Sequence, residues 1–163
     1  MAHGEWFALV RALGNRVVHL VPNWILRKLY PLEYVRQKIL ILPAGTGPLF
    51  YVTPGRPLRI DAVQLKVVNL LPFPVDLESI EGEILIESNY VTNVSKVPAL
   101  TINRTCVGDV YWTLDLSDNQ AAIVRGYPTD CPQFKMRGAA NLRGPYGKFT
   151  LQIQVEMRSF VYK

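Results

Sequence analysis

Few residues in this sequence have the types and spacing that chemistry requires. The two cysteines, Cys106 and Cys131, form no Cys-x-x-Cys motif, and both histidines, His3 and His19, lie far from them near the N-terminus. Zinc sites and cysteine nucleophiles need histidines or further thiols close by. We therefore predict no metal site, no cofactor and no catalytic residue, and we expect that the protein is not an enzyme.

Acidic residues and glycines offer two further candidates for chemistry. Glu81, Glu83 and Glu87 alternate with apolar residues, and a solvated face of a sheet accounts for such carboxylates without a catalytic role. The pair Gly45-x-Gly47 does not follow a strand and open a helix, which is the context that a phosphate-binding loop needs. Neither pattern indicates an active site.

The cysteines could still have a structural role. Cys106 and Cys131 are separated by 24 residues, a spacing that would allow a disulfide between a strand and a loop. Two unpaired thiols are the alternative, and the sequence leaves both open. Asn93-Val-Ser and Asn103-Arg-Thr match the glycosylation acceptor pattern, which has meaning only in a secreted chain. The N-terminus does not have the composition of a cleaved signal peptide.

The positive charge is concentrated at one end of the chain. The sequence has 163 residues, 49% of them hydrophobic, and a net charge of +5. Residues 1–42 hold six basic and two acidic residues and so carry +4 of this charge. A basic front end on a nearly neutral body favours an anionic membrane surface or an acidic protein partner. The body has no basic stripe, so nucleic acid is not expected as a partner.

Residues 1–43 are expected to be helical. Between Glu5 and Val21 the apolar residues recur at the spacing of a helix, with arginines on the opposite side. Asn23 is a candidate N-cap for a second, short helix over 24–29, and Pro31 suits the first turn of a third that runs from Leu32 to about Leu40.

This front end is too charged to span a membrane, because arginines and lysines interrupt every window of about 20 residues. It has the composition of an amphipathic helix that lies in a membrane interface, although the same apolar stripe would equally suit a contact with another protein or subunit. The predicted contact residues are apolar (Trp6, Leu9, Val10, Leu13, Val17 and Trp24) or basic (Arg11, Arg16, Arg27 and Lys28).

Residues 44–163 are expected to form a mainly β domain. The stretch 60–88 consists of two alternating runs on either side of the corner Asn69-Leu-Leu-Pro-Phe-Pro, where the prolines must end or bulge the strand. Further strands are predicted over 49–52, 97–106, 109–117, 134–143 and 148–162, with a short helix over 117–126. This spacing predicts an antiparallel β-sandwich of the immunoglobulin or fibronectin type III kind.

The corner and the segments after it resemble a known family. Val63 to Leu77, the short helix, the stretch from Lys135 to Gly144 and the closing strand are similar in order to the late-embryogenesis-abundant type 2 family, which includes the WHy domain. The resemblance covers residues 57–163, and it departs from the family pattern because Leu70 and Leu71 separate the asparagine from the first proline. It implies a β-sandwich without catalytic residues that serves stress protection, lipid contact or scaffolding, often tethered to a membrane.

We therefore expect a non-enzymatic β-sandwich whose basic helical front end docks it to a membrane surface. The alternative is a structural subunit of a larger assembly or filament, in which these helices insert into a neighbouring subunit. An oligomer is compatible with either function.

Overall fold

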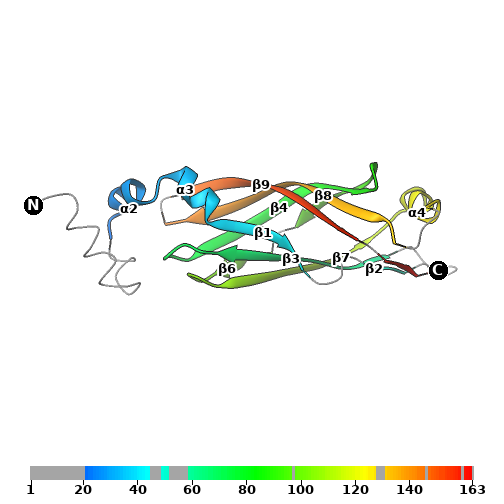
Figure 1. Ribbon diagram of the computed structural model, residues 1–163, viewed down its shortest axis with the longest axis horizontal. Coiled ribbons are helices and arrows are strands. Elements are labelled where there is room, and N and C mark those ends of the chain that lie inside the picture. The colour runs from blue at the N-terminus through cyan, green and yellow to red at the C-terminus, as the bar shows by residue number, and fades with distance from the viewer. Residues whose placement is uncertain are drawn as a thin grey trace, which may run out of the picture.

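The computed structural model describes residues 21–44, 49–51, 59–96, 98–127, 131–145, 147–158 and 160–162. These residues form an elongated antiparallel β-sandwich, with two helices at one end and a third at the other (Figure 1). The predicted fold class is thus confirmed. The helix expected between Glu5 and Val21 lies outside the described residues, and so do its predicted contact residues Trp6, Leu9, Val10, Arg11, Leu13, Arg16 and Val17.

One of the two sheets is built around β3 (Arg59–Asn69), and we call it the β3 sheet. Two short strands pair with successive halves of one side of β3, while a longer strand pairs with the other side. All these pairs are antiparallel, and the last strand of the chain adds to β2 in parallel. The partners of β3 are β1 (Ile39–Pro43), β2 (Leu49–Tyr51), β7 (Val107–Asp115) and, through β2, β10 (Phe160–Tyr162).

The other sheet is built around β4 (Val75–Ile86), and we call it the β4 sheet. One side of β4 pairs with a strand of equal length, and the other side pairs with two shorter strands in succession. All of its pairs are antiparallel. The remaining strands are β5 (Asn89–Lys96), β6 (Leu100–Ile102), β8 (Gln133–Gly144) and β9 (Gly147–Arg158).

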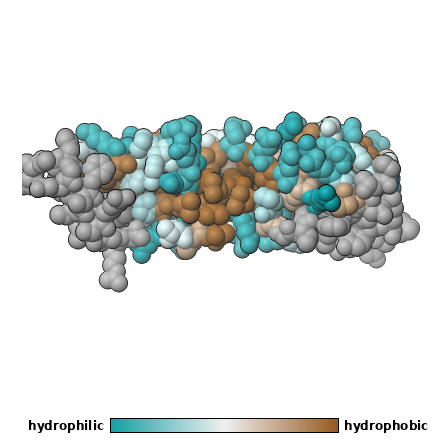
Figure 2. All heavy atoms as spheres, viewed as in Figure 1, coloured by the Kyte–Doolittle hydropathy of each residue, from teal (hydrophilic) through white to brown (hydrophobic). Residues whose placement is uncertain are grey.

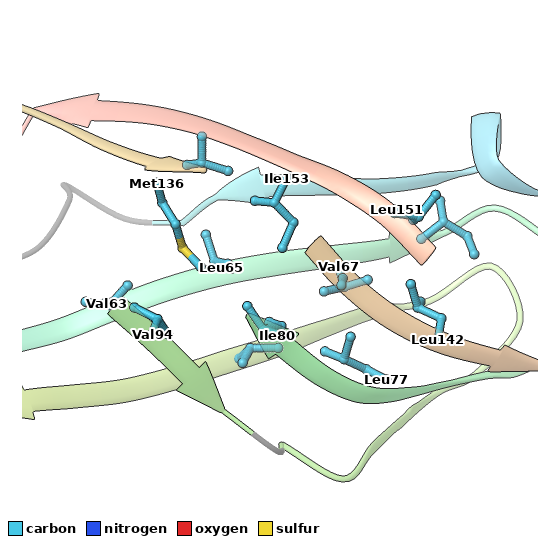
Figure 3. Packing of buried hydrophobic residues seen from close by; sticks show 14 of the residues in the cluster. Val63, Leu65, Val67, Leu77, Ile80, Val94, Met136, Leu142, Leu151 and Ile153 are labelled. Atoms are coloured by element: carbon cyan, nitrogen blue, oxygen red, sulfur yellow. The ribbon is translucent and has the colours of Figure 1, made fainter. Parts of the chain in front are cut away.

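The core lies between the sheets and comes from the alternating runs of the sequence. Alternate side chains of a strand point to opposite faces, and those of β3, β4, β8 and β9 that face inward meet in one cluster (Figure 3). The predicted inward positions are confirmed: Val63, Leu65 and Val67 are fully buried, as are Ile80 and Ile84. The outward positions of β9 are exposed throughout.

A buried asparagine holds the proline corner between β3 and β4. Asn69 is fully buried, and its Nδ2 donates to the carbonyl oxygens of Phe73 at 2.9 Å and of Ile102 and Asn103 at 3.1 Å. Its Oδ1 accepts from the backbone N–H of Leu71 at 3.0 Å. The side chain therefore satisfies the backbone groups that the corner removes from the sheet, and β3 ends there as the prolines predict.

The predicted strand over 97–106 is wrong. Among the described residues 98–106 only Leu100–Ile102 forms a strand, and Ala99 and Thr105 have positive φ angles of 45° and 49°, which an extended strand cannot contain. The neighbouring strand β5 was not expected from the sequence. Its register against β4 skips Val91, and a bulge of this kind breaks the alternation by which strands are recognised.

The helix predicted over 117–126 is confirmed as α4 (Asp118–Arg125). Ser117 and Gln120 form a reciprocal capping box, in which the Ser117 N–H donates to Oε1 of Gln120 at 2.8 Å. Ala121 and Val124 of α4 are buried against the end of the sandwich. Local capping chemistry and an apolar face together place this helix.

The helical front end stops earlier in the chain than predicted. Helix α2 spans Asn23–Leu29 and follows Pro22, so Asn23 is its first residue and not its cap; α3 spans Leu32–Gln37. The prediction that helix extends to residue 40, in a helical segment of residues 1–43, is wrong because Ile39–Pro43 is strand β1, hydrogen-bonded to β3. Pairing with a distant strand outweighs the weak local preference for helix.

Candidate docking surface

Helix α2 is anchored to the sandwich by one side and exposes the other. Leu26 is 2% exposed and belongs to the core, whereas Trp24 is 64% exposed. Arg27 and Lys28 occupy the last turn of α2 and are also exposed. The structure therefore brings together the described members of the predicted contact set, namely a large aromatic ring and two basic side chains, on the exposed side of one helix.

Aromatic contacts fasten this helical end to the proline corner. The ring of Tyr30 packs edge-on against Phe73 with 5.5 Å between centroids, and it also contacts Tyr34 at 5.8 Å. The ammonium group of Lys38 lies 5.5 Å from the centroid of the Tyr34 ring, a cation–π distance. Val35 of α3 is fully buried. The two helices are consequently attached to the corner that Asn69 organises.

An aliphatic surface continues from α3 onto the outer face of the β3 sheet. Leu40 of β1 is directly opposite Val68 of β3, which in turn is opposite Val107 of β7. Leu42 follows on β1, and Leu70 extends the register because its N–H donates to the Lys38 carbonyl. Four of these side chains are well exposed: Leu40 at 41%, Leu42 at 44%, Leu70 at 48% and Val107 at 53%. We call the five residues the aliphatic patch.

Figure 2 shows apolar atoms in the middle of the molecule, in the region where Figure 1 draws β1 and β3. The aliphatic patch was not predicted from the sequence. The signal was the unbroken apolar run 39–42, which fits neither a one-sided helix nor a solvated edge strand.

The outer face of the β4 sheet has a different chemistry. The carboxylate of Glu78 forms ion pairs with Lys148 at 2.8 Å and Arg143 at 2.5 Å. The hydrogen bond from Lys148, with the charges of both partners, lowers the pKa of Glu78 below its ordinary value. Thr150 donates to Asn141, whose amide donates to Ser79, each at 2.9 Å. A shallow hollow of about 400 Å³ lies among these groups, which satisfy one another across three strands.

The two cysteines are too far apart to be bonded. Cys106 is exposed where β3 ends, since its carbonyl accepts from the Asn69 N–H, and Cys131 is half-buried just before β8. These positions lie at opposite ends of β4, which is 12 residues long, or roughly 40 Å. A disulfide needs Cα atoms within about 7 Å. The predicted alternative of a disulfide is therefore wrong.

The other sequence candidates are solvent-facing. Glu81 and Glu83 lie on the outer side of β4, and Asn93 and Asn103 are exposed. Oε1 of Glu87 accepts from the backbone N–H of Gln133 at 2.8 Å, which joins the end of β4 to the start of β8. Within the described ranges no group of three or more His, Cys, Asp or Glu could hold a metal ion, and none of the described helices is long and apolar enough to cross a membrane.

Comparisons with known proteins support the fold. No protein family model and no curated protein matches the sequence. Among solved structures, the X-ray structure of Northeast Structural Genomics Consortium target SoR45 is similar with a TM-score of 0.52 and 13% identity, over 74% of this chain and 84% of that chain. A crystal structure of a protein from Archaeoglobus fulgidus has a TM-score of 0.47 and 11% identity, over 77% and 96% of the two chains.

At 13% identity the first of these likenesses concerns the fold alone. It agrees with the two antiparallel sheets described above. The protein is thus a mainly antiparallel β-sandwich.

Proposed function

We propose that this protein is a non-enzymatic β-sandwich module that docks, by its helical end, to an anionic membrane surface. The observation that carries the proposal is the arrangement of α2, where Trp24 is 64% exposed while Leu26 of the same helix is buried in the sandwich. An exposed tryptophan beside Arg27 and Lys28 has the two components of interfacial binding, an amphipathic ring and positive charge. The family resemblance, with its implied lipid contact, supports the same function.

Rigid attachment of the helices adds to this argument. Tyr30 packs on Phe73, so α2 and α3 present their exposed residues without first having to order themselves. A preorganised surface loses less conformational entropy when it binds. The basic residues of α2 would add about 1 kcal/mol each near an anionic surface.

The test is flotation of the full chain with vesicles of phosphatidylcholine alone and of phosphatidylcholine mixed with phosphatidylserine, at low and high salt. The full chain is required because β1 pairs with β3, so removal of residues 1–43 would remove a strand of the sandwich. We expect binding to the anionic vesicles only, and weaker binding at high salt because exposed charges are screened.

Two charge-matched variants locate the surface. Arg27→Gln/Lys28→Gln should weaken vesicle binding by roughly tenfold or more, and Trp24→Ala should weaken it also. Arg125→Gln/Arg158→Gln removes the same charge from exposed positions on α4 and β9 and should bind almost like the wild type. The proposal fails if the wild type does not float with anionic vesicles, or if both charge variants lose binding equally.

A structural subunit of a larger assembly is the second candidate, favoured by the exposure of Leu32 and Tyr34 on α3. It predicts an oligomer whose mass, measured by sedimentation, decreases when Leu32→Ser is introduced, and no flotation with either vesicle.

A further inference from the structure

The two outer faces of the sandwich differ in a way that the docking of α2 does not explain. On the β4 sheet most outward positions are polar, with Leu85, Tyr90 and Ala139 as apolar exceptions, and the charges balance. Five acidic residues there (Asp76, Glu78, Glu81, Glu83 and Glu156) accompany five basic ones (Lys135, Arg137, Arg143, Lys148 and Arg158). Several of them are joined in ion pairs. This face is adapted to water.

On the β3 sheet most outward positions near the helices are aliphatic, although Lys66 and Asp109 lie in the same row as Leu42. Leu40, Val68 and Val107 form one row across three paired strands, and Leu42 and Leu70 lie on either side of that row. Solvated faces of antiparallel sheets normally alternate polar residues outward. A contiguous group of exposed aliphatic side chains across three strands instead indicates a surface that binds a membrane or an apolar surface of another molecule.

The border of the aliphatic patch identifies the kind of partner. Lys66 is exposed on β3, and Arg104 is exposed in the turn before β7, at the same end of the sandwich. Lys38 lies between α3 and β1 beside the ring of Tyr34. Asp109, opposite Lys66 on β7, is the acidic side chain among them. A mainly basic border would repel the same border of a second copy of this chain, and it would attract an anionic surface.

We propose that the outer face of the β3 sheet is the membrane-facing side of the sandwich, with the aliphatic patch lying at the boundary between the headgroups and acyl chains of an anionic bilayer. The sandwich would then lie on its side and not stand on its helical end. This inference rests on the proposed function, since it extends the membrane contact of the helical end. The patch continues directly from α3 through Lys38. A helical end and a sheet face together give a larger buried apolar area than α2 alone.

The first experiment measures vesicle binding of two matched variants. Leu40→Ser/Leu42→Ser removes apolar area from the aliphatic patch, and both positions are half-exposed, so the fold should tolerate the change. Ile123→Ser changes a side chain of similar exposure on α4, at the opposite end. We expect the patch variant to bind phosphatidylserine vesicles roughly tenfold more weakly, and Ile123→Ser to bind like the wild type. Circular dichroism and thermal unfolding are the controls that test whether both variants fold.

The second experiment reports orientation independently of affinity. Two singly labelled proteins carry an environment-sensitive dye. In the first, Cys131→Ser leaves Cys106, beside Val107, as the labelling site. In the second, Cys106→Ser/Cys131→Ser is combined with Gln152→Cys, which places the dye on the outer side of β9. Brominated lipids should quench the dye at residue 106 and not at residue 152. The inference is overturned if the dye is quenched equally at both positions. It is also overturned if Leu40→Ser/Leu42→Ser binds like the wild type while Arg27→Gln/Lys28→Gln loses binding. Either result leaves the proposed function standing. Absence of wild-type binding overturns the proposed function itself.

Discussion

Gly82 of β4 lies directly opposite Gly138 of β8, and neither position has room for a side chain. A methyl group on Gly82 would overlap the carbonyl oxygen of Arg137, and one on Gly138 would overlap that of Glu81. Because both obstacles are backbone atoms within a paired ladder, neither can move aside without disturbing the centre of the β4 sheet. The close approach of these two strands therefore depends on the glycine pair.

Substitution of either glycine by alanine should destabilise the protein. We expect Gly82→Ala and Gly138→Ala each to lower the free energy of unfolding by about 1–3 kcal/mol, measured by urea denaturation. Gly144→Ala is the matched control on the same strand, since a methyl group there would make only an ordinary contact of 3.5 Å with Phe149. Equal stability of all three variants would contradict the close packing of β4 on β8.

Loss of the Asn69 side chain should be more damaging than loss of an exposed asparagine. Asn69→Ala leaves the Leu71 N–H and the carbonyls of Phe73 and Ile102 without their partner in a buried site. We expect a loss of about 2–4 kcal/mol in unfolding free energy, because each unsatisfied buried group costs about 1–3 kcal/mol. Asn141→Ala, which alters hydrogen bonds near the surface, is the control and should cost less than half as much.

The capping box of α4 offers a smaller, local test. Ser117→Ala removes the cap and should reduce stability by about 1 kcal/mol, whereas Ser117→Asp should keep most of it because aspartate also caps. Thermal unfolding of the two variants measures the difference. If Ser117→Asp were as unstable as Ser117→Ala, the side chain at residue 117 would not act as a cap.

The ion pairs of Glu78 predict a dependence of stability on pH. Lys148 and Arg143 lower the pKa of Glu78 in the folded protein from its ordinary value of 4.5. A lowered folded pKa contributes stability that is present above pH 4.5 and is lost as the pH falls through the folded pKa. The effect should be small, because the group is exposed and its ion pairs are screened by solvent.

Glu78→Gln isolates this contribution. The wild type should be the more stable of the two at pH 7, and the difference should shrink as the pH falls below about 4.5. Carboxyl titration by NMR measures the same pKa directly. An unchanged difference between the two proteins from pH 7 to pH 3 would show that the ion pairs of Glu78 do not contribute.

Much of this protein follows from local patterns in the sequence. Residues 63–67 and 149–155 alternate with period two, and that alternation, which the backbone imposes on any strand, is enough to predict which side chains are buried. The prolines at 72 and 74 end β3 because they lack an N–H. Ser117 and Gln120 predict the start of α4, because the capping hydrogen bonds between them lie within one helical turn. In each case the residues that cause the structure lie within a few positions of the structure itself, so the local sequence is enough to predict it.

Only the tertiary structure decided the remainder, because it depends on pairs of residues far apart in the chain. Ile39–Pro43 became a strand through hydrogen bonds to residues 65–69, although a helix precedes it directly. The bulge at Val91 depends on β4, and the separation of Cys106 from Cys131 depends on the length of the sandwich. The aliphatic patch arises in the same way, since Leu40, Val68 and Val107 become neighbours only when β1, β3 and β7 pair. The sequence determined which residues are apolar, and the register of the sheet determined which of them remain outside.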